Sequence, residues 1–279
     1  MNNSKSMGDS CPVGIFDSGI GGLSVLQEIH QLLPNENLIY VGDSAHAPYG
    51  DRSAKHVRER SQAIADFLLD QGVKAIVIAC NTATAEAAVQ LRETMDVPVI
   101  GLEPAIKPAS QLSKSGIIGV LATQRTIDSE RLLGLTERFA KNKKVLAQAC
   151  PGLVERVESS ELESAETMTL LKQYIQPLLD QGVDALILGC THYPFLLPAI
   201  RKITGDEIQI LETGKPVALH LKNVLKHNNL RNDSTDTQHQ KVELAFYNSF
   251  KNRQHRSSLE KSMLRLWKNP IKIQELSIK

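Results

Sequence analysis

The chain has 279 residues, of which 42% are hydrophobic and 23% charged, and its formal net charge is +1. This length suffices for one large domain or two small ones, each with its own core. A net charge so close to zero does not favour a nucleic-acid or membrane partner. We expect the polar residues 1–11 to form a disordered tail, and no apolar run reaches the roughly 18 residues of a membrane span.

Short apolar runs alternate with longer amphipathic ones in the first third of the chain. The apolar runs predict strands at 13–16, 38–41, 75–79 and 97–100, and the amphipathic stretches predict helices at 23–33 and 55–70. This alternation is typical of the βαβ units of a parallel sheet.

The same rhythm starts again after Glu103 and Pro104. Here we expect strands at 116–121, 144–149 and 185–189, and helices at 125–139, 164–179 and 195–203. The polar segment 226–240 is expected to be a loop whose basic residues are solvated, since its charges do not form a block of one sign. A strand, a helix and a strand follow at 242–246, 259–267 and 271–278. The sequence therefore predicts an α/β fold with two parallel-sheet domains of similar design.

A repeat is the most informative feature of the sequence. Residues 68–80, LLDQGVKAIVIAC, return at 178–190 as LLDQGVDALILGC. Each copy indicates a helix end, a glycine turn, a short strand and then a cysteine, followed by polar residues suited to starting a helix. Both thiols are thus expected at the carboxyl end of a strand and under a helix N-terminus, where anions and thiolates are stabilised. Two thiols related by duplication predict one site that is approached from two sides.

The other two cysteines, Cys11 and Cys150, lack a duplicated context and are expected to be small buried hydrophobes. All four cysteines are scattered without CxxC spacing, which predicts reduced thiols in a cytoplasmic protein. Cys190 and His192 resemble half of a zinc site, but no second pair with ligand spacing accompanies them, so we expect no metal. A cysteine hydrolase with His192 as base is another alternative, and it leaves one of the two thiols without a role.

A glycine-rich loop, DSGIGGLS at 17–24, follows the first predicted strand. It falls one residue short of a dinucleotide fingerprint, and Asp43 ends the second strand at about the right distance. Asp17, however, stands before the first glycine, where its carboxylate would repel a pyrophosphate. A plain tight turn would explain the glycines but not the aspartate.

Four separated motifs carry a family resemblance: DSGIGG at 17–22, PYG at 48–50, ACNTAT at 79–84 and GCTHYP at 189–194. In this order and spacing they resemble the glutamate racemases of the aspartate/glutamate racemase superfamily, over most of residues 13–218. In the aspartate branch a glutamate usually occupies the position of His192, so His192 favours glutamate as the substrate.

The resemblance implies a cofactor-independent racemase that makes D-glutamate for peptidoglycan. It implies two pseudo-symmetric α/β domains with the active site between them, the first formed by residues 12–103 and 214–279 and the second by 104–213. The resemblance is compatible with a homodimer but does not decide the oligomeric state. Near residue 210 the family commonly has an aspartate, whereas this chain has Leu211 and Glu212.

Racemisation needs a base and an acid on opposite faces of a planar carbanion, and Cys80 and Cys190 meet that demand as thiolate and thiol. By resemblance, Asp17 assists Cys80, His192 assists Cys190, and Glu158 supports His192. The expected substrate-binding residues, which supply hydroxyls, an amide and backbone N–H groups for the ammonium and carboxylates, are Asp17, Ser18, Pro48, Tyr49, Gly50, Asn81, Thr82, Thr123, Thr126, Thr191 and His192. A binding protein or an inactive enzyme relative could share this fold, but mere binding does not need both thiols.

Overall fold

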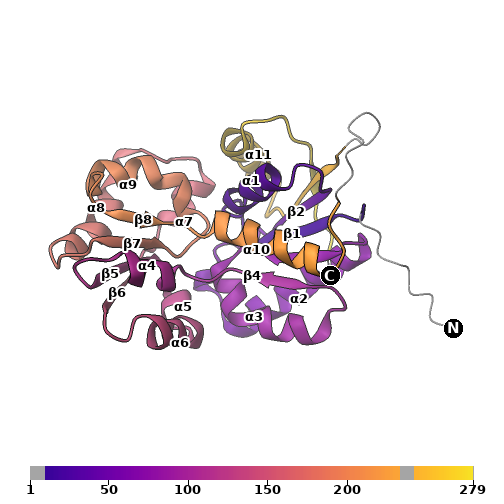
Figure 1. Ribbon diagram of the computed structural model, residues 1–279. Helices are drawn as coiled ribbons and strands as arrows, with labels where there is room; N and C mark the ends of the chain where they lie inside the picture. The colour runs from indigo at the N-terminus through magenta and orange to yellow at the C-terminus, as the bar shows by residue number, and fades with distance from the viewer. Residues whose placement is uncertain (1–9, 233–241, 279) are drawn as a thin grey trace.

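The computed structural model describes residues 10–232 and 242–278, and it contains two parallel sheets in two adjoining lobes (Figure 1). The first lobe is the six-stranded sheet with its helices, and the second lobe is the four-stranded sheet with its helices. The prediction of an α/β fold with two parallel sheets is confirmed. Residues 1–9 of the predicted tail and residues 233–240 of the predicted loop lie outside the described residues. The domain boundaries given above stay a prediction.

The sheet of the first lobe has the strand order β10-β9-β2-β1-β3-β4, with every neighbouring pair parallel. Every residue of β1, β2 and β3 is buried, which explains why these strands are continuous apolar runs rather than alternating ones. The strands are β1 Val13–Asp17, β2 Leu38–Gly42, β3 Ala75–Ile78, β4 Val99–Gly101, β9 Leu244–Asn248 and β10 Ile273–Glu275.

The sheet of the second lobe has the order β6-β5-β7-β8, again with every pair parallel. This order corresponds strand by strand to the β2-β1-β3-β4 part of the first sheet, with β7 in the place of β3. The repeated sequence is therefore a repeated structure. The strands are β5 Ile117–Ala122, β6 Lys144–Ala149, β7 Ala185–Leu188 and β8 Gln209–Leu211.

The two copies of the repeat also share the turn that leads into these strands. Helix α2, Ala54–Asp70, and helix α8, Ala165–Leu179, each end a few residues before a glycine. Gly72 and Gly182 have φ angles of 74° and 85°, in the left-handed region that favours glycine. The repeated glycine thus lets the chain leave the helix and enter β3 or β7.

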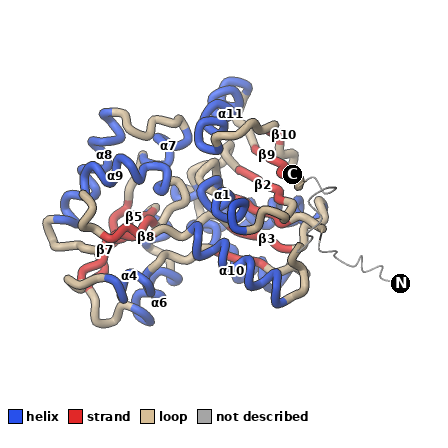
Figure 2. The backbone as a smooth tube through the Cα atoms, turned by 45° about the horizontal axis from the view of Figure 1, so that its top comes forward, coloured by secondary structure: helices blue, strands red, loops and turns tan. Residues whose placement is uncertain are grey.

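Helices cover both sheets (Figure 2). The predicted helix at 125–139 is in fact two helices, because the Ser129 side chain accepts a hydrogen bond from the Leu132 N–H and starts a new helix. The predicted strand at 271–278 is shorter than expected, and the last turn of α10 occupies the start of the predicted loop at 226. The remaining elements are α1 Leu23–Leu32, η1 Tyr49–Asp51, α3 Asn81–Thr94, α4 Ile106–Leu112, α5 Gln124–Ile127, α6 Glu130–Phe139, α7 Leu153–Glu158, η2 Tyr193–Leu196, α9 Leu197–Thr204, α10 Gly214–His227 and α11 Arg253–Trp267.

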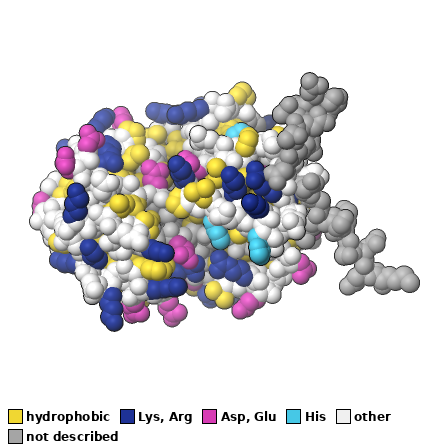
Figure 3. Space-filling model, in the orientation of Figure 1, with side chains coloured by type: hydrophobic (Ala, Val, Ile, Leu, Met, Phe, Trp, Pro, Cys, Tyr) yellow, Lys and Arg dark blue, Asp and Glu magenta, His cyan; other side chains and the backbone are white. Residues whose placement is uncertain are grey.

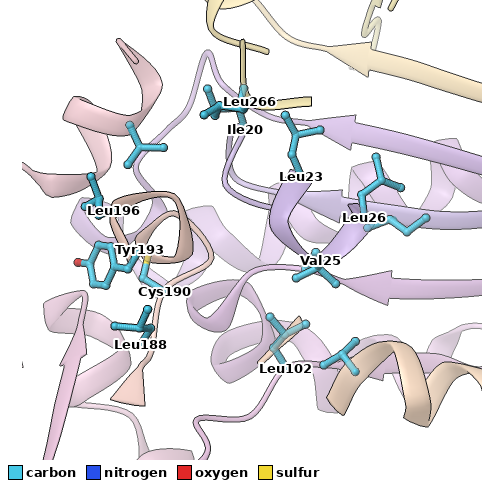
Figure 4. Packing of buried hydrophobic residues seen from close by; sticks show 14 of the residues in the cluster. Ile20, Leu23, Val25, Leu26, Leu102, Leu188, Cys190, Tyr193, Leu196 and Leu266 are labelled. Atoms are coloured by element: carbon cyan, nitrogen blue, oxygen red, sulfur yellow. The ribbon is translucent and has the colours of Figure 1, made fainter. Parts of the chain in front are cut away.

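One hydrophobic cluster runs through both lobes. In Figure 4, Ile20 and Leu23 of the first lobe lie on one side of it, and Cys190, Tyr193 and Leu196 of the second lobe lie on the other. The lobes therefore share packed side chains at the carboxyl ends of their strands, where α/β proteins place their sites.

The surface has mixed charge: on the face shown in Figure 3, basic and acidic side chains are interspersed with hydrophobic ones. Within the described part of the chain, no helix is both long and apolar enough to cross a bilayer.

Candidate active site

The two repeated cysteines line one small cavity between the lobes. Cys80 follows β3 and Cys190 follows β7, so each lobe contributes the thiol at the end of the equivalent strand. The cavity is lined by Ser18, Pro48, Tyr49, Gly50, Cys80, Asn81, Thr82, Thr123, Val154, Gly189, Cys190, Thr191 and His192. The expectation from duplication, one site approached from two sides, matches this arrangement.

Cys80 caps the N-terminus of α3. Its Sγ accepts the Ala83 N–H at 3.4 Å and lies 3.7 Å from the Ser18 Oγ, to which the thiol can donate. Burial, and next the nearby charge of Asp17, raise the pKa of the Cys80 thiol well above its ordinary value, despite the helix N-terminus. The raised pKa favours the neutral thiol form of Cys80.

Cys190 has a different partner. The Nδ1 of His192 lies 3.7 Å from the Cys190 Sγ, and the Nε2 of His192 lies 2.8 Å from the Glu158 Oε1. Burial lowers the pKa of His192, but the hydrogen bonds and charges of Cys190 and Glu158 outweigh it and raise that pKa well above the usual value. The two cysteines therefore have neighbours of opposite kind, a carboxylate near Cys80 and a histidine beside Cys190.

Glu158 is held in place from the first lobe as well. Its Oε1 accepts the Ile20 N–H at 2.8 Å, besides facing His192. One carboxylate oxygen thus joins the glycine loop of the first lobe to the histidine of the second. The predicted support of His192 by Glu158 agrees with this geometry, and Glu158 stands behind His192 rather than on the cavity wall.

Asp17 is fully buried at the end of β1. Its Oδ2 accepts the N–H groups of Gly19 at 3.2 Å and Gly22 at 3.0 Å, and its Oδ1 accepts the Thr191 hydroxyl at 3.2 Å. Burial raises the pKa of the Asp17 carboxyl, while the charge of His192 and these N–H groups oppose that rise. Asp17 therefore fixes the glycine loop and the residue after Cys190, and it acts on Cys80 through its charge.

The glycines of this loop are needed for close contact with the second lobe. A Cβ at Gly19 would overlap the Glu158 carboxylate, and a Cβ at Gly21 would overlap the His192 ring. The side chains of the Glu158–His192 pair thus fill the space in front of the loop that a pyrophosphate would need. This packing accounts for the glycines, and the N–H groups that bond to Asp17 account for the aspartate, which the dinucleotide alternative did not explain.

Polar groups for a substrate surround the thiols. The Asn81 side chain is buried, and neither its Oδ1 nor its Nδ2 has a hydrogen-bond partner among the described residues. The hydroxyls of Thr82, Thr123 and Thr126 lie 3.0 to 3.3 Å from one another across the two lobes. Unpaired buried amide atoms on a cavity wall are groups that a ligand can satisfy.

The structure brings nearly all predicted residues to the cavity wall. Asp17, Glu158 and Thr126 are the exceptions, and each instead hydrogen-bonds a residue that lines the wall. The sequence analysis missed two lining residues, Val154 and Gly189. Gly189 could have been predicted, because it precedes Cys190 in the repeat. No pattern in the sequence marks Val154 as a lining residue.

The other two cysteines do not line this cavity. Cys150 is buried as expected, and burial raises the pKa of its thiol to about 12, whereas the expectation that Cys11 is buried was wrong, because Cys11 is partly exposed. Among residues 10–232 and 242–278, no three His, Cys, Asp or Glu side chains are grouped so that they could hold a metal ion.

Two parallel sheets of matching strand order present a pair of duplicated thiols to a single cavity, which is the arrangement of a two-lobed α/β enzyme with its site between the lobes. The chain belongs to the family described as Asp/Glu/Hydantoin racemase, whose model matches residues 13–219. The prediction of a racemase, an isomerase of the glutamate racemase type, is confirmed at the level of family and enzyme class.

Curated relatives and solved structures agree with this assignment. A glutamate racemase of Stutzerimonas stutzeri is 49% identical over 230 residues, which are 82% of this chain and 87% of the relative. A glutamate racemase of Pseudomonas aeruginosa is 52% identical over 218 residues, 78% of this chain and 82% of the relative.

Among solved structures, the glutamate racemase of Francisella tularensis in complex with D-glutamate has a TM-score of 0.82 at 30% identity and covers 96% of this chain and 98% of its own. The Escherichia coli glutamate racemase, in complex with L-glutamate and the activator UDP-MurNAc-ala, has a TM-score of 0.83 at 30% identity, with 96% and 99% covered.

Proposed function

We propose that this protein interconverts L- and D-glutamate by a two-base mechanism that uses Cys80 and Cys190 and no cofactor. The observation that carries the proposal is the pair of thiols with opposite surroundings on one cavity. The Cys190 side holds a histidine that favours the thiolate, and the Cys80 side holds a thiol with a raised pKa.

In one direction, the Cys190 thiolate removes the α-proton from one face of the substrate, and the Cys80 thiol delivers its proton to the opposite face. In the other direction the roles are exchanged. The racemisation step needs no third proton carrier, because it moves one proton onto the Cys190 sulfur and one proton off the Cys80 sulfur. The site is then in the state from which the reverse direction starts, and it returns to its first state when Cys190 loses a proton to water and Cys80 takes one up from water.

The substrate carboxylates are proposed to bind at the helix start after Cys80 and at the turn after Cys190. The N-terminus of α3 with Asn81 and Thr82, the hydroxyl of Thr191, and Ser18 supply donors there. The unpaired Asn81 amide supports this placement, since a bound carboxylate or ammonium would satisfy it.

Glutamate, rather than aspartate, is favoured by His192 and by relatives that are glutamate racemases. Solved structures of similar fold contain D-glutamate or L-glutamate, which also supports the proposal. A mechanism that depends on free thiols suits a reducing compartment, so we propose that the protein acts in the cytoplasm. The use of D-glutamate for peptidoglycan and a homodimeric assembly stay predictions.

Circular dichroism of L-glutamate, followed with protein freed of pyridoxal phosphate and metals, tests this proposal. We expect the optical signal to decay to that of the racemate, with L-aspartate converted far more slowly. Activity that requires added pyridoxal phosphate, or equal rates on aspartate, would contradict the proposal.

A further inference from the structure

The loop after β2, taken here as residues 43–50 and so including the start of η1, carries three residues of the cavity wall, Pro48, Tyr49 and Gly50. It begins at Asp43, whose carboxylate is completely buried. The Asp43 Oδ2 accepts the Tyr49 hydroxyl at 2.7 Å and the Arg60 Nε at 2.9 Å, and a second Arg60 nitrogen reaches the Oδ1 at 2.9 Å. The Tyr49 hydroxyl thus donates its hydrogen bond within the protein, and this bond to Asp43 fixes the position of the Tyr49 side chain.

The pKa of Asp43 indicates which form it takes. Burial raises that pKa. The hydrogen bonds and the charge of Arg60, together with the hydrogen bonds of Tyr49 and Ser249, outweigh burial and hold the pKa below its usual value. Asp43 is therefore an ionised carboxylate that accepts hydrogen bonds only.

The C-terminal part of the chain completes the hydrogen bonds of this loop. Strand β9 pairs with β2 so that Asn248 lies opposite Gly42, and the two strands lie side by side in Figure 2. The Asn248 Oδ1 accepts the Ser44 N–H at 3.2 Å. The Ser249 Oγ accepts the Ala45 N–H at 3.0 Å and donates to the Asp43 Oδ1 at 2.8 Å.

Together, Asn248 and Ser249 thus bond to the Asp43 carboxylate, where the loop begins, and to the next two backbone N–H groups, those of Ser44 and Ala45. Asn248 is fully buried and Ser249 is 8% exposed, so water competes little for these bonds. Both residues lie beyond residue 219, where the match to the family model ends.

We propose that Ser249, with Asn248, is a positioning residue for the substrate, because it fixes the loop that presents Tyr49 and Gly50 to the cavity. The proposal rests on the proposed function, in that the substrate positioned is glutamate. A loop held in this way contacts the substrate equally in the ground state and the transition state. Loss of the hydrogen bonds that hold the loop therefore raises KM more than it lowers kcat.

Ser249→Ala tests this inference with two readouts. We expect KM for L-glutamate to rise roughly ten-fold with kcat within about two-fold of wild type, in line with the loss of buried hydrogen bonds. We also expect the Ser44 and Ala45 amides to exchange with solvent about ten-fold faster, as followed by NMR. Ser249→Thr keeps the hydroxyl and is expected to stay near wild type in both measurements.

Ser262→Ala is the matched control, since Ser262 is a buried serine of α11 in the same C-terminal segment. The inference is overturned if Ser249→Ala leaves KM unchanged, if it leaves the amide exchange unchanged, or if Ser262→Ala and Ser249→Thr raise KM as much. Failure of the wild-type protein to racemise glutamate would count against the proposed function alone, because the amide exchange still tests the loop.

Discussion

The surroundings of Cys80 differ from those of Cys190, although the sequences that lead to both are nearly the same. Burial and the charge of Asp17 disfavour the ionisation of Cys80 and outweigh its hydrogen bonds with Ala83 and Ser18. Cys190 lies beside His192, whose proton is retained with the help of Glu158. Equivalent strand ends thus place one thiol near a carboxylate and the other beside a histidine.

This difference separates two contributions to the site. The duplication sets the geometry, because it places two sulfurs at the ends of equivalent strands in the two facing lobes. The residues after and around each cysteine set its chemical surroundings, and they do not repeat: Asn81 stands where the other copy has Thr191, and Thr82 where it has His192. A symmetric scaffold therefore carries two cysteines with different neighbours, which the proposed mechanism uses as acid and base.

The largest expected effects come from removing either thiol. Cys80→Ser and Cys190→Ser should each lower racemisation by about 10⁴-fold, because an alcohol is a poor proton carrier at neutral pH. Each variant keeps one thiol on one face of the α-carbon. With an analogue that loses a β-leaving group once the carbanion forms, one variant should eliminate from one enantiomer and the other from the opposite one.

Cys150→Ser is the control for these variants and should keep wild-type turnover, since Cys150 is not on the wall of this cavity. The same enantiomer preference in both active-site variants would show that the two thiols do not face opposite sides of the substrate.

Asp17→Asn should lower turnover by about 10²-fold, because it removes the charge next to Cys80 and weakens the anchor of the glycine loop. The pKa of the Cys80 thiol should fall, since the Asp17 charge raises it; the ultraviolet absorbance of the thiolate, titrated against pH, measures this. The exposed Asp70→Asn should change neither quantity. Unchanged turnover together with binding of NAD would instead support the dinucleotide alternative.

The pH dependence of kcat in Glu158→Gln tests whether Glu158 supports His192 beside Cys190. Glu158 raises the pKa of His192, so its loss should lower that pKa, and the imidazolium should then be lost at a lower pH. We expect kcat to fall by roughly ten-fold or more and the alkaline limb of the kcat profile to move to lower pH. Glu155→Gln, on the exposed face of the same helix, should leave the profile in place. A Glu158→Gln profile identical to wild type would refute the role given to Glu158.

The smallest expected effect tests the contact between the lobes. Gly21→Ala places a methyl group against the His192 ring and should destabilise the protein by about 1–3 kcal/mol, as overpacking does. Turnover should fall as well, because His192 must shift. Gly134→Ala has open space around the added methyl and lies within α6, so it should be neutral or slightly stabilising. Thermal unfolding of both variants measures the contrast, and equal stabilities would contradict the close contact.

Much of the fold and site could be predicted from local patterns. Buried parallel strands are continuous apolar runs, and the repeat placed Cys80 and Cys190 at equivalent strand ends. Asp17 and His192 stood out because each is a polar residue beside a strand end or cysteine.

Contacts between distant residues could not be predicted in the same way. The bonds from Ser249 to Asp43 and from Asp17 to Thr191 join residues far apart in the chain, and no local pattern marks them. The break between α5 and α6 was missed because the cap at Ser129 interrupts a stretch that is otherwise amphipathic. Val154 lines the cavity as one apolar residue among many.

The central claim, that two opposed thiols exchange a proton with the substrate, is tested most directly in heavy water. With wild-type protein and L-glutamate, the account predicts that the α-position of the D-glutamate formed carries solvent deuterium before much deuterium appears in the recovered L-glutamate. The reason is that the thiol that donates is not the one that removed the proton. Mass spectrometry of the separated enantiomers at low conversion gives the result. Equal labelling of L- and D-glutamate from the start would mean that a single base serves both faces, and it would contradict the account.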